Sequence, residues 1–414
     1  MKKLKKLTKL AAAVALGLAS AWALPFPAEA AIQTIEASGV YVMDSRLGET
    51  TEAATARARE DAKRAAAEKA GVYVESYSKT VNMVLEEDEV RTIAAQLLKI
   101  QGEKSKVAVL EDSLLQFTVT ITALVDDSGV DMQRAVSTDK SVLSEDARRN
   151  SELQREYDEL KKQMEELKRR YEGAGEAQRA EIKAEAAANT QRFGAAEELE
   201  KANGLFTRGD YTQALSAYTR ALGLNPRLPE AYNNRGLAYY HLRQYSEAVN
   251  DFNQAAALKP NFLQAYSNRG MVHLEQGQPA QAIQDCTQAL SIDSRFAPAL
   301  NNRGRAYVAA GQADHALGDL QQAARIMPGS ADIHNNLGSA YMMLKSYREA
   351  VNEYGQAIRL NGNFAEAYYN RALAYCNLGQ FMEALPDAQR AKELNPGDGA
   401  ASDLYSRIRS KLGG

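Results

Sequence analysis

Cysteine, histidine and tryptophan are scarce in this chain. Its 414 residues include two cysteines, four histidines and one tryptophan. No two histidines have the i, i+4 spacing of a metal-binding pair on a helix. A phosphate loop, a dinucleotide fingerprint and a serine or cysteine nucleophile motif are also missing from the sequence. We therefore expect a protein that is not an enzyme and that uses no cofactor and no metal.

Long hydrophobic runs are missing as well, except near the N-terminus. Five lysines precede an apolar run from Leu10 to Leu24, and residues 25–30 end in Ala28-Glu29-Ala30. The run is short for a helix that crosses roughly 30 Å of hydrocarbon, and its A-x-A ending fits cleavage by signal peptidase. We predict that residues 1–30 are a cleaved signal peptide and that the protein is periplasmic or secreted. An uncleaved membrane anchor is the alternative.

An excess of positive charge is also missing. Without residues 1–30 the chain keeps 45 basic and 52 acidic residues, a net charge of −7. A mildly acidic protein is not suited to hold nucleic acid by releasing counterions, so we expect no nucleic-acid partner. No later segment has 18 consecutive apolar residues, so we expect no membrane span after signal cleavage.

From Ala195 onward the sequence repeats itself every 34 residues, with small residues at fixed positions of each unit. Small residues let two helix backbones approach closely, so each unit is expected to be a helical hairpin. A single hairpin has one apolar face too many and must bury it on the next hairpin. The two clearest columns are Ala214, Ala248, Ala282, Ala316, Ala350 and Ala384, and Ala202, Gly236, Gly270, Gly304, Gly338 and Ala372.

These units resemble tetratricopeptide repeats. The resemblance implies a mainly α fold, an α-solenoid of six hairpins over 195–398, closed by an amphipathic capping helix in 399–414. Cys286 and Cys376 lie three units apart, too far for the Cα separation of roughly 4.4–6.8 Å that a disulfide needs. We expect free thiols that are buried or face the groove, with an intermolecular bridge through Cys376 as the alternative. The six units start at Ala195, Pro229, Leu263, Ala297, Ala331 and Ala365.

Residues 31–136 show the mixed patterns of a small α+β domain. The junction of a helix, a glycine and the sequence VYVESY, followed by an acidic helix and a hairpin, resembles the N-terminal domain of flagellar assembly envelope proteins. This resemblance implies a fold class and an export setting, and no active residue. The predicted elements are a strand over 32–43 with a break at Gly39, a helix over 49–70 ended by Gly71, a strand over 72–85, a helix over 86–100, and a hairpin of 104–111 and 114–126.

Residues 137–194 are predicted to be a helical connector. Apolar residues in it follow the alternating steps of four and three that form a coiled-coil seam. A short coiled coil would let residues 143–171 form a homo-oligomer. A single solvated helix and a helix packed on the first domain are the alternatives. The seam residues are Leu153, Tyr157, Leu160, Met164, Leu167 and Tyr171.

An asparagine recurs at the sixth position of five repeats. Asparagine costs about 0.5–0.7 kcal/mol against alanine inside a helix, so a column of five calls for a reason. An amide offers donors and an acceptor, and one per repeat could clamp the backbone of an extended peptide. A purely structural role is the alternative. The candidate peptide-binding residues are Asn234, Asn268, Asn302, Asn336 and Asn370, with Tyr240, Met271, Arg305, Met342 and Tyr369 as neighbouring groove residues.

Together these patterns predict a non-enzymatic scaffold of the cell envelope, which binds a partner protein or an extended peptide in the concave groove of the repeats. Two alternatives remain open. One is an oligomeric envelope organiser in which the repeats act as a spacer. The other is a peptidoglycan- or carbohydrate-handling factor, in which Tyr240 and Tyr369 would stack on sugars.

Overall fold

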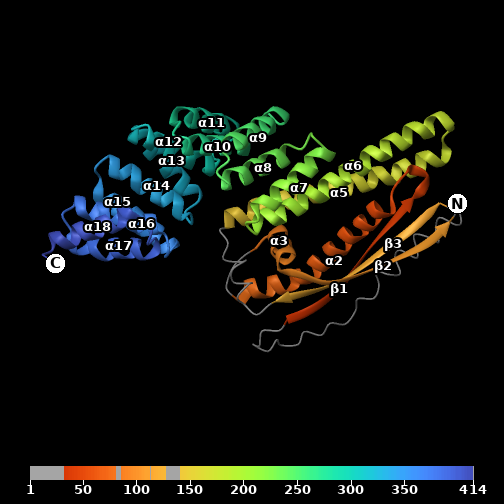
Figure 1. The fold of residues 1–414 in the computed structure, drawn as a ribbon, viewed down its shortest axis with the longest axis horizontal. Helices are drawn as coiled ribbons and strands as arrows, with labels where there is room; N and C mark the ends of the chain where they lie inside the picture. The colour runs from red at the N-terminus through yellow and green to blue at the C-terminus, as the bar shows by residue number, and fades with distance from the viewer. Residues whose placement is uncertain (1–31, 81–84, 112, 127–139, 414) are drawn as a thin grey trace.

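The computed structural model describes residues 32–80, 85–111, 113–126 and 140–413 (Figure 1). The predicted signal peptide lies outside the described residues. A sheet with two covering helices is followed by a long helical hairpin, from which an array of shorter hairpins curls away to the C-terminal end. The sheet unit contains β1 (Ile32–Asp44), the short 3-10 helix η1 (Ser45–Leu47), α2 (Thr51–Thr80), α3 (Glu87–Leu97), β2 (Leu98–Glu111) and β3 (Leu114–Asp126).

Helix α2 is longer than the sequence predicted. The predicted end at Gly71 is wrong, and so is the predicted strand over residues 72–80, because α2 runs on to Thr80. Residues 81–84 of that predicted strand lie outside the described residues. Residues four apart form a stripe that is completely buried, and Val74 continues this stripe past Gly71. Burial of Val74 on the sheet therefore overrides the strand preference of its β-branched neighbours. The stripe consists of Ala54, Ala58, Ala62, Ala66, Ala70 and Val74.

The sheet is antiparallel, with strand order β1-β3-β2. The predicted break at Gly39 is wrong, because Gly39 pairs with Val119 inside a continuous strand. A Cβ at this position would overlap the carbonyl oxygen of Ala58 and the amide nitrogen of Ala62. Gly39 is therefore the point at which α2 crosses β1 with backbone against backbone. The predicted hairpin is confirmed, but its first strand begins at Leu98, which shortens the predicted helix over 86–100 to α3.

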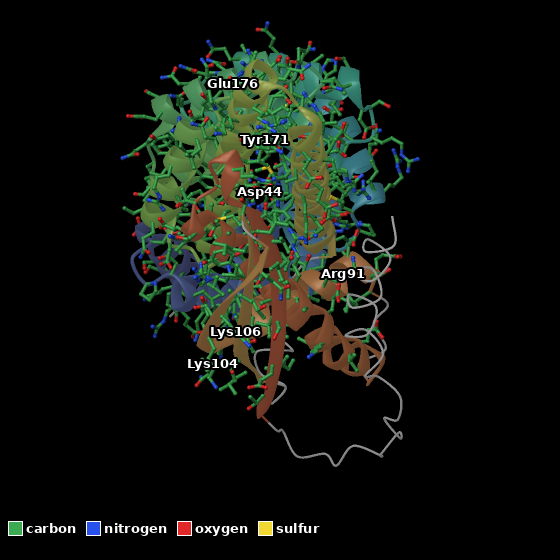
Figure 2. All side chains as sticks on the ribbon, turned by 90° about the vertical axis from the view of Figure 1, so that its right-hand side faces the viewer. Asp44, Arg91, Lys104, Lys106, Tyr171 and Glu176 are labelled. Atoms are coloured by element: carbon green, nitrogen blue, oxygen red, sulfur yellow. The ribbon has the colours of Figure 1, made fainter. Side chains whose placement is uncertain are left out.

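The predicted connector is a second layer on the sheet unit. Helices α5 (Lys140–Gly173) and α6 (Glu176–Thr207) pack against each other as an antiparallel pair. The seam residues Tyr157, Leu160, Met164 and Leu167 are at most 6% exposed, against α6 and the sheet unit. The structure thus shows the alternative in which this helix packs on its own first domain. In Figure 2 Tyr171 and Glu176 mark the tip of the pair, close to Asp44 at the end of β1.

Helix α6 runs without a break through the predicted domain boundary at residue 194, so the first repeat grows directly out of the connector. The remaining hairpins follow the predicted spacing. Their first helices are α8 (Pro229–His241), α10 (Leu263–Glu275), α12 (Ala297–Ala309), α14 (Ala331–Met343) and α16 (Ala365–Asn377). Their second helices, beginning with that of the first repeat, are α7 (Tyr211–Leu224), α9 (Tyr245–Leu258), α11 (Pro279–Ile292), α13 (Ala313–Ile326), α15 (Tyr347–Leu360) and α17 (Phe381–Leu394), and α18 (Gly399–Lys411) closes the array.

The glycine column explains how close the two helices of a hairpin lie. A Cβ at Gly304 would stand 2.5 Å from Cγ of Leu320, and one at Gly338 would stand 2.6 Å from Cε1 of Tyr354. Real Cβ atoms do not approach other heavy atoms so closely, so a large residue of the second helix occupies the space that the glycine leaves. The expectation that small residues allow close helix approach is confirmed.

Candidate functional site: the face formed by the first helices

The array bends toward its first helices. First helices of neighbouring repeats contact each other along the array, from α8 to α16, whereas neighbouring second helices make fewer such contacts. Closer spacing on one side makes that side concave. The predicted groove residues lie on this side or at its edge, because all ten belong to first helices.

The asparagine column forms a ladder across the concave face. In four repeats the asparagine amide donates a hydrogen bond to the residue 35 positions earlier, on the preceding first helix. The bonds join Asn268 to Asn233 (3.0 Å), Asn302 to the carbonyl and hydroxyl oxygens of Ser267 (3.3 and 3.2 Å), Asn336 to Asn301 (2.9 Å) and Asn370 to Asn335 (3.2 Å). The column therefore joins neighbouring repeats, as the structural alternative requires.

The first member of the column is bound differently. Asn234 donates to Asn203 of α6 at 3.0 Å and accepts from Asn233 at 3.1 Å. Its side chain is 5% exposed, so its hydrogen-bonding groups are largely committed inside the protein.

Four members of the ladder have a side-chain oxygen that accepts no bond from any described group, namely buried Asn302 and half-buried Asn268, Asn336 and Asn370. None of the oxygens of the three half-buried members is among the buried polar atoms that lack a partner, so all three reach solvent. Each half-buried asparagine thus donates through its amide nitrogen to the preceding repeat and keeps an acceptor oxygen that no described group uses.

The remaining predicted groove residues are spread along the face. Tyr240 belongs to an aromatic group with His241 and Tyr245, at centroid distances of 5.5 and 6.0 Å, and burial raises its pKa. Arg305 forms an ion pair with Glu275 of the preceding repeat at 3.3 Å. Met271, Met342 and Tyr369 are half-buried. These side chains do not converge on one centre, which is a property of an extended contact surface.

Sequence reasoning missed a second ladder, which joins the helices of each hairpin. An arginine next to the asparagine column binds an aspartate 16 residues later with two parallel bonds of 2.5–2.9 Å, and this hydrogen bonding raises the pKa of each arginine. In three repeats the arginine also donates to the second helix of the preceding repeat. The recurring spacing of 16 was the available signal. The pairs are Arg235–Asp251, Arg269–Asp285, Arg303–Asp319 and Arg371–Asp387.

The fifth repeat lacks this arginine–aspartate pair, which we call the clasp of a hairpin, and has another polar contact in its place. Leu337 stands where the arginine would be and is buried, and Glu353 stands where the aspartate would be. Glu353 instead accepts from Nδ1 of His334 at 2.7 Å, and Nε2 of His334 lies 3.1 Å from the carbonyl oxygen of Pro328. The hydrogen bond to Glu353 raises the pKa of His334. The array therefore contains a polar contact whose charge depends on pH.

Both cysteines are free, as predicted. Cys286 is buried beneath Gly270, and burial raises the pKa of its thiol to about 12. Cys376 is half-buried on α16, and burial raises its pKa as well.

Over the described ranges no cluster of three histidine, cysteine, aspartate or glutamate residues could hold a metal ion. Among the helices that the structure describes, none has the length and apolar character needed to cross a bilayer.

Three family models of tetratricopeptide repeats match this part of the chain, at residues 203–266, at 263–296 and 365–398, and at 304–345 and 343–379. No curated protein matches the sequence at a significant level. The matched segments begin at residue 203, so the resemblance of residues 31–136 to flagellar assembly envelope proteins stays a prediction.

Several solved structures are similar to this chain over part of its length. PilF of Pseudomonas aeruginosa is 16% identical, with 53% of this chain and 99% of that chain covered and a TM-score of 0.46. PilW, a widely conserved type IV pilus biogenesis factor, is 19% identical over 51% of this chain and 97% of that chain, with a TM-score of 0.47. A chain of the APC/C hetero-tetramer Cut9-Hcn1 is 16% identical, with 86% of this chain and 73% of that chain covered and a TM-score of 0.50.

The likeness to Cut9-Hcn1, at 16% identity, shows the fold alone. The family models, the spacing of 34 and the hairpin geometry agree with one another. Proteins built from these repeats generally mediate protein–protein interactions. Residues 203–398 are an array of tetratricopeptide repeats.

Proposed function

We propose that this protein is a non-enzymatic scaffold of the cell envelope whose concave face binds an extended segment of a partner protein. The observation that carries the proposal is the row of open acceptors at Asn268, Asn336 and Asn370. Main-chain N–H groups of an extended segment need acceptors at intervals, and amides held by a neighbouring repeat supply them without losing further rotamer freedom.

Half-buried Met271 and Met342 add adaptable apolar contacts to the same face.

Export is proposed from the pattern of residues 1–30. Tyr240 and Tyr369 belong to the second and the sixth repeat and lie in separate apolar clusters. Sugar stacking by both rings at one site is therefore less well supported than protein binding. A homo-oligomer through 143–171 would have to form while most of the seam stays covered by α6 and the sheet unit.

Differential affinity capture from an envelope extract tests the proposal. The bait carries Asn268→Ala, Asn336→Ala and Asn370→Ala, and the matched control carries Asn250→Ala, Asn261→Ala and Asn352→Ala, at exposed positions outside the first helices. Each ladder substitution removes one inter-repeat hydrogen bond, worth about 0.5–1.5 kcal/mol, so both variants are first compared by helicity and melting temperature. We expect one protein to be lost from the first variant and retained by the second. Equal captures by folded variants would contradict the proposal.

A further inference from the structure

A cavity of about 730 Å³ lies at the C-terminal end of the array, between α16, the start of α17 and α18. Its apolar lining includes Leu373, Phe381, Leu404 and Ile408. Leu373 occupies the same repeat position as Met271 and Arg305, so the cavity opens at the end of the concave face. Its volume falls in the range of sites that take a small ligand or a few side chains of a peptide.

The charge at this cavity is of one sign. Two of its ten lining residues, Arg407 and Lys411, are cations one helical turn apart on α18, and none is acidic. Both side chains are exposed, and neither has an ion pair with any residue that the structure describes. Lys411 lies 5.9 Å from the ring centroid of Phe381, so its charge stands directly at the apolar lining.

Cations near two other surfaces of the molecule have carboxylate partners of their own. Arg305 on the concave face is paired with Glu275. A cavity of about 380 Å³ beside α2 also has cations in its lining, but there Lys63 is paired with Glu60 and Arg64 with Asp158. The C-terminal cavity thus combines an apolar surface with positive charge that the chain does not neutralise.

We propose that this cavity binds an acidic peptide segment, in which a large apolar side chain enters the cavity and flanking carboxylates pair with Arg407 and Lys411. Burial of the apolar side chain supplies affinity, while the two cations select carboxylates on either side of it. This inference rests on the proposed function, because it names the chemistry that one end of the concave face recognises.

Fluorescence polarisation with synthetic peptides tests the inference on the full chain. The probe is a fluorescein-labelled decapeptide with a central leucine between pairs of aspartates. We expect it to bind wild-type protein, and we expect Arg407→Gln with Lys411→Gln to weaken this binding at least about tenfold at low salt, since bonds between charged partners are lost. A peptide with asparagines for aspartates should be weakened similarly, and one with serine for leucine should not bind.

The matched control replaces two exposed cations that do not line the cavity, Arg409 and Arg348, by glutamine. It removes the same charge, so it should bind the probe as the wild type does. Equal binding by the cavity variant, equal loss in the control, or no binding of the probe would overturn the inference. None of these results bears on the asparagine ladder, because that test uses other variants and a captured protein.

Discussion

The two halves of the molecule bury polar groups in different ways. In the repeat array the polar contacts are regular and local, with ladders that link residues 16 or 35 positions apart. In the sheet unit and the α5–α6 pair the contacts occur once and span long stretches of chain. Arg57 binds Glu49 and the hydroxyl group of Tyr41, and it reaches Thr190 of α6 at 3.2 Å, 133 residues away.

This difference predicts two modes of stability. A regular array distributes its free energy of unfolding over similar units and their interfaces, so a local defect weakens one place. The sheet unit depends on single contacts that no neighbour duplicates. Arg57 is 3% exposed, lies 4.0 Å from the ring centroid of Phe193, and has a buried Nε atom without a partner in the described structure. Damage there should unfold the whole unit.

The largest effect is expected for Gly39→Ala. The added Cβ would meet backbone atoms of α2, which cannot rotate away as a side chain would. We expect the free energy of unfolding of the sheet unit to fall by roughly 3 kcal/mol or more, at the upper end of overpacking costs. Urea unfolding followed by circular dichroism measures this change. Gly102→Ala is the control, because a Cβ there meets nothing within 4 Å, and an equal loss in both variants would contradict the account.

The second effect concerns the buried ion pair of the sheet unit. Arg57→Ala leaves Glu49, whose side chain is fully buried, without its nearest cation. Removing one partner of a buried pair typically costs about 3–5 kcal/mol. Arg59 lies on the same helix as Arg57 and forms a solvent-accessible pair with Glu103 of β2, so Arg59→Ala should cost no more than about 1 kcal/mol. Chemical denaturation compares the two variants, and similar losses would show that burial of Arg57 is unimportant.

A smaller effect is expected in the array. Arg303→Ala breaks the two hydrogen bonds to buried Asp319, which should cost about 1.5–3 kcal/mol. The loss should be confined to the fourth repeat and its neighbours, because the other clasps remain. Hydrogen exchange followed by mass spectrometry would locate it. Arg305→Ala, which removes a more exposed pair two residues away, is the control, and uniform loss of protection along the chain would argue against modular stability.

The smallest effect depends on pH. The folded state raises the pKa of His334 above its ordinary value of about 6.5. Protonated His334 therefore contributes its full stabilisation at pH values below 6.5. The contribution is lost as the pH rises through the folded-state pKa. The destabilisation caused by His334→Gln should therefore be larger at pH 5.5 than at pH 8.5. Urea midpoints of this variant and of the control His315→Gln measure the effect. If the destabilisation by His334→Gln is the same at both pH values, the contact of His334 with Glu353 does not depend on pH.

The same contrast explains what the sequence could predict. The array was predictable because all six repeats need small residues at the same positions. The alanine and glycine columns therefore identified the hairpins directly. The ladder partners were not predicted, because a distance of 35 residues becomes a contact only when first helices lie side by side. In the sheet unit each signal occurs once. The strand preference of residues 72–80 was misleading there because only the fold shows that Val74 extends the buried stripe of α2.

The sequence predicted where the residues of the candidate site lie, but not which hydrogen bonds their side chains form. Periodicity placed all five asparagines on one face, but it could not show that Asn234 is committed to Asn203 while Asn268 keeps an open oxygen. Likewise the seam of α5 was read correctly as apolar, yet its partners, α6 and the sheet unit, are distant in sequence. The C-terminal cavity has no counterpart in the repeat columns, because Arg407 and Lys411 lie on a helix outside the six repeats.

Site-specific photo-crosslinking in cells tests directly whether the concave face binds a partner protein. A photoreactive phenylalanine analogue is placed at Met271 on the concave face and, in a separate variant, at Asn250 on the second helix α9. Neither substitution removes a ladder bond, and the melting temperatures of both variants are compared first. We expect a discrete crosslinked product from Met271 and none from Asn250. A product from Asn250 alone would place the binding surface elsewhere and contradict the proposed function.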